Sequence, residues 1–139
     1  NDTLPPTRGE EQELAQVIRN LVGNAIKYTN PDTEVLLTAR LTSDLPEDPA
    51  FRKLTRAIAF SVEDHGEGIP KEHIPRLTER FYRVDTARTR KVGGTGLGLA
   101  IVKHVLNRHH GVLAIDSDVG QGSTFTVYLP VYDDMLSAA

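Results

Sequence analysis

Four glycines fall within the six residues 93–98, directly before the apolar stretch Leu99-Ala100-Ile101-Val102. Because glycine permits backbone angles and close approaches that other residues exclude, a loop of this kind can wrap around a ligand. A helix that begins just after the loop offers free N–H groups and a positive dipole end, both of which suit phosphate. The pattern indicates a phosphate-binding loop, although a flexible surface loop can have the same glycine content.

Three kinds of phosphate-binding loop are possible for this segment. A phosphate-lysine loop requires Lys and then Ser or Thr after its last glycine, and here Leu99 and Ala100 follow instead. A dinucleotide fingerprint is closer, since a helix and Asp116 lie downstream, but it requires a strand before the glycines. The preceding residues 85–91 are polar and basic and do not form a strand pattern. The third interpretation is a glycine-hinged lid at 84–96 that closes its basic residues over phosphates.

A second group of candidate residues lies along a predicted helix that begins at Glu11 and ends before Asn30-Pro31-Asp32. Its apolar face has a three-to-four-residue period and comprises Leu14, Val17, Ile18, Leu21, Val22, Ala25 and Ile26. The other flank carries Gln16, Asn20, Asn24 and Lys27, with Tyr28 at the border. Two asparagines one turn apart need a reason, because each costs roughly half a kcal/mol of helix propensity relative to alanine. Their amide oxygens are neutral, hard ligands that suit magnesium, whereas a solvated face is the simpler alternative.

Asp64 is a third candidate, because it stands where a predicted strand ends. Alternating apolar residues predict strands at about 34–43 and 56–64. Gly66 and Gly68 follow the aspartate, so a flat ligand could lie against the backbone at this point. An ordinary glycine turn explains the segment equally well when the segment is taken alone.

The remaining elements place these candidates in one α/β domain. After Asp64 the sequence predicts one or two short helices at 70–83, broken near Pro75, and a helix from about 97 to 109. Two strands at 112–117 and 123–129, joined by a hairpin, follow. The order predicts a two-layer α/β sandwich, in which helices cover one face of a mixed, mostly antiparallel sheet. The domain is expected to span 10–130, with a linker or edge segment at 1–9 and a loose C-terminal tail at 131–139.

The composition is that of an ordinary globular protein. The 139 residues carry a formal net charge of −3, which argues against a nucleic-acid-binding protein. The absence of cysteine fits a reducing compartment and excludes thiolate chemistry. No apolar run reaches membrane-spanning length, and no signal peptide is visible. Since the sequence begins with Asn1 and not methionine, we expect it to be a fragment of a longer protein.

Four segments in order resemble the catalytic and ATP-binding domain of bacterial sensor histidine kinases, within the GHKL superfamily of gyrase, Hsp90 and the DNA-repair protein MutL. They are an asparagine box at 20–28, a first glycine box at 64–68, a phenylalanine box at 79–85 and a second glycine box at 94–99. The strand Gly122-Ser123-Thr124-Phe125 also fits, so the resemblance covers about residues 9–130 and implies a Bergerat-type ATP-binding fold. The phenylalanine and second glycine boxes look most like those of the phosphate-sensing type of sensor kinase.

The resemblance implies ATP and Mg²⁺ as cofactors and gives the polar motif residues a role. Asn24 would ligate magnesium, and Asn20 would support the metal and phosphate site. Lys27 and Arg83 would contact phosphate oxygens, where fixed positive charge stabilises the transferring group. The lid hinge and the phosphate cradle would be formed by Gly94, Thr95, Gly96, Leu97 and Gly98.

For the base of ATP, the resemblance implies a pocket around the first glycine box. Asp64 would accept a hydrogen bond from the adenine amino group, and Gly66 and Gly68 would let the backbone approach the ring. Tyr28 and Ile69 would cover the faces of the ring, and Thr124 would contact its edge through a water molecule.

Hydrolases of the superfamily place a general-base glutamate where this chain has Asn20. Because an amide cannot take a proton from water, rapid ATP hydrolysis is not expected. The acceptor histidine of family members lies in an upstream helical hairpin, and none of the five histidines here has such a context. The resemblance therefore implies a protein-histidine kinase domain that holds ATP for an acceptor elsewhere.

The implied partners are the dimerisation and histidine-phosphotransfer hairpin of the same parent kinase and a response regulator. Neither nucleic acid nor direct membrane contact is expected, and the isolated domain is expected to be a monomer. The implied location is cytoplasmic, and anchorage of the parent kinase in the inner membrane is left open. Two alternatives are a free-standing serine kinase of the anti-sigma-factor type, and a module that senses ATP without phosphoryl transfer.

Overall fold

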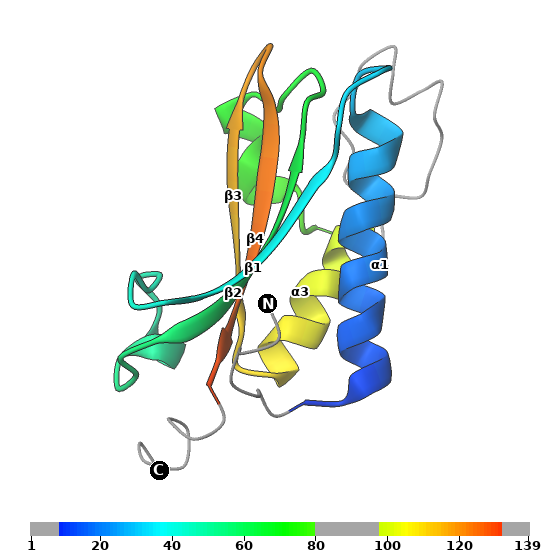
Figure 1. Cartoon of the computed structure of the whole chain (residues 1–139). Helices are drawn as coiled ribbons and strands as arrows, with labels where there is room; N and C mark the ends of the chain where they lie inside the picture. Colours follow the sequence, from blue (N-terminus) through cyan, green and yellow to red (C-terminus); the bar gives the residue numbers. More distant parts are fainter. Residues whose placement is uncertain (1–8, 80–97, 132–139) are drawn as a thin grey trace.

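The structure, a computed structural model, describes residues 9–79 and 98–131 (Figure 1). Its elements are, in chain order, α1 (Glu11–Tyr28), β1 (Leu36–Thr42), the 3-10 helix η1 (Pro49–Phe51), β2 (Ala57–Asp64), the 3-10 helix η2 (Lys71–Arg76), α3 (Gly98–Arg108), β3 (Val112–Asp118) and β4 (Gly122–Pro130). Each strand and each long helix predicted within these residues is present. In place of the short helices predicted at 70–83 and broken near Pro75, the described part contains the single 3-10 helix η2, which includes Pro75. No helix among the described residues is long and apolar enough to cross a membrane.

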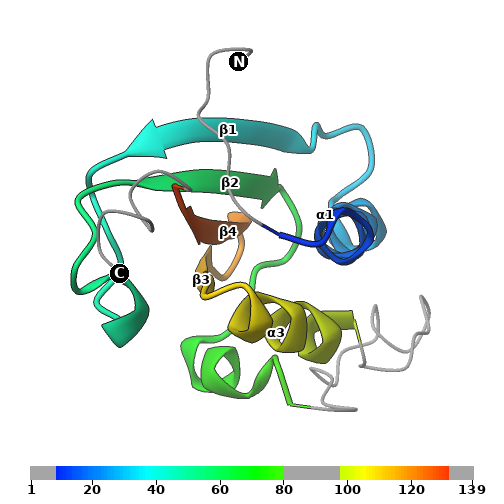
Figure 2. The ribbon, with the colours of Figure 1, turned by 90° about the horizontal axis from the view of Figure 1, so that it is seen from below.

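The four strands form one sheet in the order β1-β2-β4-β3. All three pairings within this sheet are antiparallel, so the described part contains no parallel pair and is not mixed. The connections explain two of these pairings, since β3 and β4 are joined by a short hairpin and β1 returns to β2 through the loop that contains η1. The predicted two-layer α/β sandwich is confirmed, with α1 and α3 side by side on one face (Figure 2).

The core lies between the two long helices and the sheet. Its buried members are Val17, Leu21 and Ala25 of α1, Val102, Val105 and Leu106 of α3, and Val62, Phe125 and Val127 of the sheet. Val62 is in register with Phe125, and Phe60 with Val127, so these side chains share the face that the helices cover. Val102 of α3 is fully buried within this core.

Helix α1 begins and ends where its local sequence allows. The Glu10 side chain caps the N-terminus by accepting hydrogen bonds from the backbone N–H groups of Gln12 and Glu13. At the other end, Thr29 takes an extended conformation before Asn30 and Pro31. The outer flank of the helix is less covered than its apolar pattern predicts, since Ile26 is 63% exposed. The reason is topological, because β1 is an edge strand and neither α1 nor α3 packs extensively over it.

The start of α1 is tied to the end of α3 by His109. The backbone N–H of Glu10 donates to His109 Nε2 at 2.9 Å, and His109 Nδ1 lies 2.8 Å from the Val105 carbonyl oxygen. Nε2 therefore accepts while Nδ1 carries the proton and donates. Arg108 Nη1 adds an ion pair with Glu13 Oε2 at 2.6 Å. These contacts hold the two helices side by side, which fixes where the polar flank of α1 lies relative to the start of α3.

Candidate functional site

The polar flank of α1 meets the first residue of α3. The Asn20 side-chain Nδ2 donates to the Gly98 carbonyl oxygen at 3.3 Å, although these residues are 78 positions apart. Since the amide nitrogen is used in this way, its Oδ1 is directed elsewhere and can serve as an acceptor or ligand. Asn24 lies one turn further along the same flank and is partly buried, and Lys27 follows it at an exposed position. The structure thus brings Asn20 into contact with Gly98, the last glycine of the second glycine box.

Asp64 is buried at the end of β2, with an exposed fraction of 6%. Its Oδ1 accepts a hydrogen bond from the Gly66 backbone N–H at 3.0 Å. Gly66 forms an isolated antiparallel bridge with Thr29, directly after the last residue of α1. The His65 N–H donates to Thr29 Oγ1 at 3.1 Å and strengthens this junction. The first glycine box is therefore joined to the C-terminal end of the helix that carries the two asparagines.

Gly66 leaves no room for a side chain, because an added Cβ would lie 2.1 Å from the Tyr28 carbonyl oxygen. Gly66→Ala is therefore expected to lower the free energy of unfolding by about 1–3 kcal/mol, since backbone would have to move. Gly23→Ala is the matched control on α1, where nothing lies within 4 Å of an added Cβ. It should raise the free energy of unfolding by about 0.5–1 kcal/mol through helix propensity. Urea denaturation measures both, and a Gly66→Ala protein as stable as wild type would contradict the close contact.

Gly68 packs against the hairpin between β3 and β4. It has a φ of 78°, and a Cβ at this position would lie 2.2 Å from the Asp118 carbonyl oxygen. The Gly120 N–H donates to the Glu67 carbonyl oxygen at 2.7 Å, so the loop and the hairpin are hydrogen-bonded to each other. The next residue, Ile69, is partly buried and packs against the core cluster. The glycine is required here by both its conformation and its contact.

A cluster of buried hydroxyl groups lies beside Asp64, and the sequence analysis did not identify it. Ser123 is in register with Asp64 on one side and with Ser117 on the other. The two serine oxygens are 2.8 Å apart, and Ser117 Oγ also accepts from the Ile69 N–H at 2.8 Å. Asp64, Ser123 and Ser117 thus form a row across three strands on the face that the helices cover.

Thr124, the residue expected at the edge of the base, lies on the other face of the sheet. It is in register with Glu63 of β2 and Asp116 of β3, whereas Ser123 is in register with Asp64. Neighbouring residues of a strand point to opposite faces, so Thr124 and Asp64 are directed apart. The signal was present in the sequence, because Phe125 is a core residue and strand alternation then places Ser123 on its face.

Part of the expected site lies outside the described residues. Arg83, the lid at 84–96 and four residues of the predicted phosphate cradle fall there, namely Gly94, Thr95, Gly96 and Leu97. Gly98 is described and is the first residue of α3. The roles given to the other residues remain predictions.

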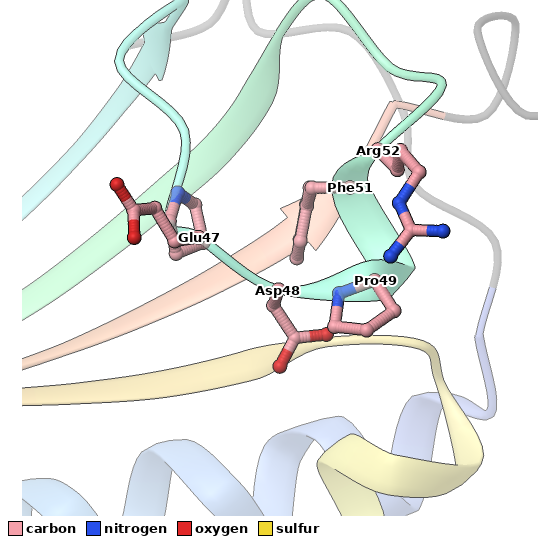
Figure 3. Close-up of a pocket in the computed structure, with 6 residues that line it drawn as sticks. Glu47, Asp48, Pro49, Phe51 and Arg52 are labelled. Atoms are coloured by element: carbon pink, nitrogen blue, oxygen red, sulfur yellow. The ribbon is translucent and has the colours of Figure 1, made fainter.

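A separate pocket of about 380 Å³ lies on the loop between β1 and β2 (Figure 3). It is lined by Pro46, Glu47, Asp48, Pro49, Phe51 and Arg52. The pocket precedes the start of β2 and Asp64 is at the end of that strand, so the two are apart along its length. Asp48 Oδ1 accepts from the Ala50 N–H at 2.9 Å and caps η1. This loop pocket therefore contains none of the residues that the sequence motifs single out.

The donor set around α1 and β2 suits magnesium and a nucleotide triphosphate. Amide oxygens are acceptable ligands for magnesium, which usually keeps several waters and binds phosphates. Asn20, held by its nitrogen at Gly98, and Asn24 supply two such oxygens one turn apart. The buried carboxylate of Asp64 and the flanking glycine backbone suit a planar base with an exocyclic amine. These residues therefore fit the expected cofactors.

Comparison with known proteins agrees with the motifs. Residues 9–133 match the family described as "Histidine kinase-, DNA gyrase B-, and HSP90-like ATPase", and the chain belongs to this family.

Two curated relatives are sensor proteins of bacteria. The phosphate regulon sensor protein PhoR of Pseudomonas aeruginosa is 48% identical over 121 residues, which are 87% of this chain and 25% of the relative. The sensor-like histidine kinase SenX3 of Mycolicibacterium smegmatis is 45% identical over 126 residues, 91% of this chain and 30% of the relative. The chain thus spans between a quarter and a third of the length of these two relatives. Because they are almost equally similar, the sensory subtype remains a prediction.

Solved structures share the fold. Full-length ShkA in complex with AMPPNP has a TM-score of 0.70 and 31% identity, over 93% of this chain and 24% of that one. The mycobacterial sensor histidine kinase MprB has a TM-score of 0.66 and 28% identity, over 91% of this chain and 75% of that one. The sandwich therefore occurs both in a protein named as a sensor histidine kinase and in a protein that binds the ATP analogue AMPPNP.

Proposed function

We propose that this chain is the ATP-binding, catalytic part of a sensor histidine kinase. It holds magnesium and ATP so that the γ-phosphate passes to a histidine in a separate dimerisation hairpin, from which a response regulator is phosphorylated. One observation carries the proposal: the buried Asp64 is joined through Gly66 to the end of α1, and Asn20 of α1 contacts the start of α3. The family match and the relative SenX3, named a sensor-like histidine kinase, support the same activity.

The triphosphate is proposed to lie along the polar flank of α1. Asn24 ligates the metal, and Asn20 orients its Oδ1 toward the metal and phosphates because its nitrogen is held by Gly98. Bound magnesium neutralises charge on the phosphate oxygens and orients them. Lys27 and Arg83 add fixed positive charge where negative charge is spread in the loose transition state of phosphoryl transfer. Positioning is then most of the catalysis, and the acceptor imidazole supplies the attacking atom.

The base is proposed to lie against the row that Asp64 begins. Asp64 accepts from the exocyclic amine, the backbone at Gly66 and Gly68 lies along the ring, and Tyr28 and Ile69 cover its faces. Ser123 takes the place first given to Thr124, because it shares the face of Asp64. Binding partners beyond the hairpin and the response regulator are not proposed. The isolated domain is expected to be a monomer, and its expected location is cytoplasmic.

Asp64 leads to a prediction about base choice. Guanine presents a carbonyl where adenine has its amino group, so two acceptors would face each other at Asp64. A buried acceptor without a donor costs about 1–3 kcal/mol, so ATP should bind at least about tenfold more tightly than GTP. Competition titration with a fluorescent ATP analogue and magnesium measures this ratio. Asp64→Asn, whose amide can offer a hydrogen, should reduce the ratio, and equal affinities in the wild type would remove Asp64 from this role.

A further inference from the structure

The hydroxyl group of Ser117 makes three contacts that together determine where every proton goes. Its oxygen accepts from the Ile69 N–H at 2.8 Å, and its O–H donates to the Gly122 carbonyl oxygen at 3.0 Å. The third contact, at 2.8 Å, is with Ser123 Oγ. A serine hydroxyl has one proton and two lone pairs. Since the proton serves Gly122 and one lone pair serves Ile69, the second lone pair must receive the proton of Ser123.

If Ser117 and not Ser123 were the donor in their contact, another buried contact would have no proton. If Ser117 donated to Ser123, its oxygen and the Gly122 carbonyl oxygen would be two acceptors 3.0 Å apart. Ser117 and Ser123 are both buried, with exposed fractions of 5% and 6%, so water does not readily relieve such a pair. The arrangement that satisfies all three contacts has Ser123 as donor to Ser117.

Ser123 consequently offers only lone pairs to anything that lies beside Asp64. The two residues are opposite each other on neighbouring antiparallel strands, where Cβ atoms are about 4.5–5.5 Å apart. Asp64 is also an acceptor when it is ionised. Its Oδ1 already accepts a hydrogen bond from the Gly66 N–H. The end of the sheet therefore presents two neighbouring acceptors, which match a ligand group carrying two hydrogens.

We propose that Ser117 is a positioning residue for base selectivity: it holds the Ser123 proton away from the ligand, so that the site accepts a 6-amino purine and rejects a 6-oxo purine. This inference rests on the proposed function, because it takes the base of ATP to lie against the row Asp64–Ser123–Ser117. Ser117 acts through Ser123 and does not itself contact the base.

Competition titration with ATP and inosine triphosphate tests the proposal, because these nucleotides differ only around position 6 of the purine. The wild type should prefer ATP by about tenfold or more. In Ser117→Ala the Ser123 proton is released and can turn toward a 6-oxo group, so the ATP preference should fall by about fivefold or more. Loss of the contact with Ile69 weakens the binding of both nucleotides equally, so it cancels in the ratio of their affinities. If the alanine variant does not fold, Ser117→Cys takes its place. It replaces the hydroxyl with a weakly hydrogen-bonding thiol and should also lower the ratio of ATP to inosine triphosphate affinity.

Ser61→Ala is the matched control, because Ser61 is a buried sheet serine whose hydroxyl contacts Thr126 Oγ1 at 3.0 Å. It is in register with Thr126 on the opposite face, and its removal should leave the ratio unchanged. Ser123→Ala should lower the ratio, and adding Ser117→Ala to it should change the ratio no further, since one residue acts through the other.

Two results would overturn the proposal. One is a Ser117→Ala protein whose affinities for ATP and for inosine triphosphate fall by the same factor. The other is a double variant whose ratio falls by the product of the two single effects, because Ser117 would then act independently of Ser123. A wild-type chain that binds neither nucleotide would instead overturn the proposed function, together with the inference built on it.

Discussion

Asn24→Ala is expected to remove magnesium-dependent ATP binding while leaving the fold intact. The residue is partly buried on the polar flank of α1 and lies outside the core cluster. Replacing asparagine by alanine in a helix raises helix propensity by roughly half a kcal/mol, so the melting temperature should not fall. Loss of groups that merely orient metal ligands costs about 10–100-fold in metal affinity. Loss of a ligand itself should therefore weaken ATP binding in magnesium by about a hundredfold or more.

Isothermal titration with ATP, in magnesium and in a chelator, measures the effect. The matched control is Gln16→Ala, which removes an amide from the same flank two turns before Asn24 and should keep the magnesium dependence. In the chelator, wild type and Asn24→Ala should bind ATP equally weakly, since the metal is absent from both. An Asn24→Ala protein that still binds ATP more tightly in magnesium would exclude this residue as the ligand.

The fold could be predicted largely because its local patterns are strong. The three-to-four-residue period of α1 and the alternation in β2 are set by neighbours in sequence, and both elements were found with ends within one or two residues. The exposure of Ile18 and Ile26 could not be predicted in this way. It depends on which strand lies at the edge of the sheet, and a helix pattern contains no information about strand order.

The candidate site was predictable where a motif is contiguous and less so where it is assembled across strands. Asp64 and Gly66 are two residues apart, and their hydrogen bond is local. Ser117 could not be identified from the sequence, because its importance arises from contacts with Ile69, 48 positions away, and with the next strand. The resemblance assigns the edge of the base to Thr124, although the alternation of β4 places Thr124 on the face opposite to that of Asp64 and Ser123. Cross-strand register decides such assignments, and register is a tertiary property.

With ATP and magnesium alone, this chain is expected neither to label itself nor to hydrolyse ATP rapidly. None of its five histidines stands in a helical hairpin context in the sequence. His109, in addition, is buried and hydrogen-bonded through both ring nitrogens. Asn20 stands where related hydrolases have a glutamate, and an amide cannot take a proton from the attacking water. Incubation with radiolabelled ATP, followed by gel and phosphate-release measurements, should give no labelled protein and only slow release.

Addition of the dimerisation hairpin from the same parent kinase should then start transfer. A neutral imidazole brought in line with the γ-phosphate supplies the acceptor, and positioning with metal and cations supplies the catalysis. The labelled product should be acid-labile and alkali-stable phosphohistidine on the hairpin, and it should be absent with Asn24→Ala or with a hairpin that lacks its histidine. Acid-stable phosphoserine on a partner would favour the anti-sigma type of kinase instead. Rapid phosphate release without any acceptor would overturn the prediction, because Asn20 cannot act as the base for water.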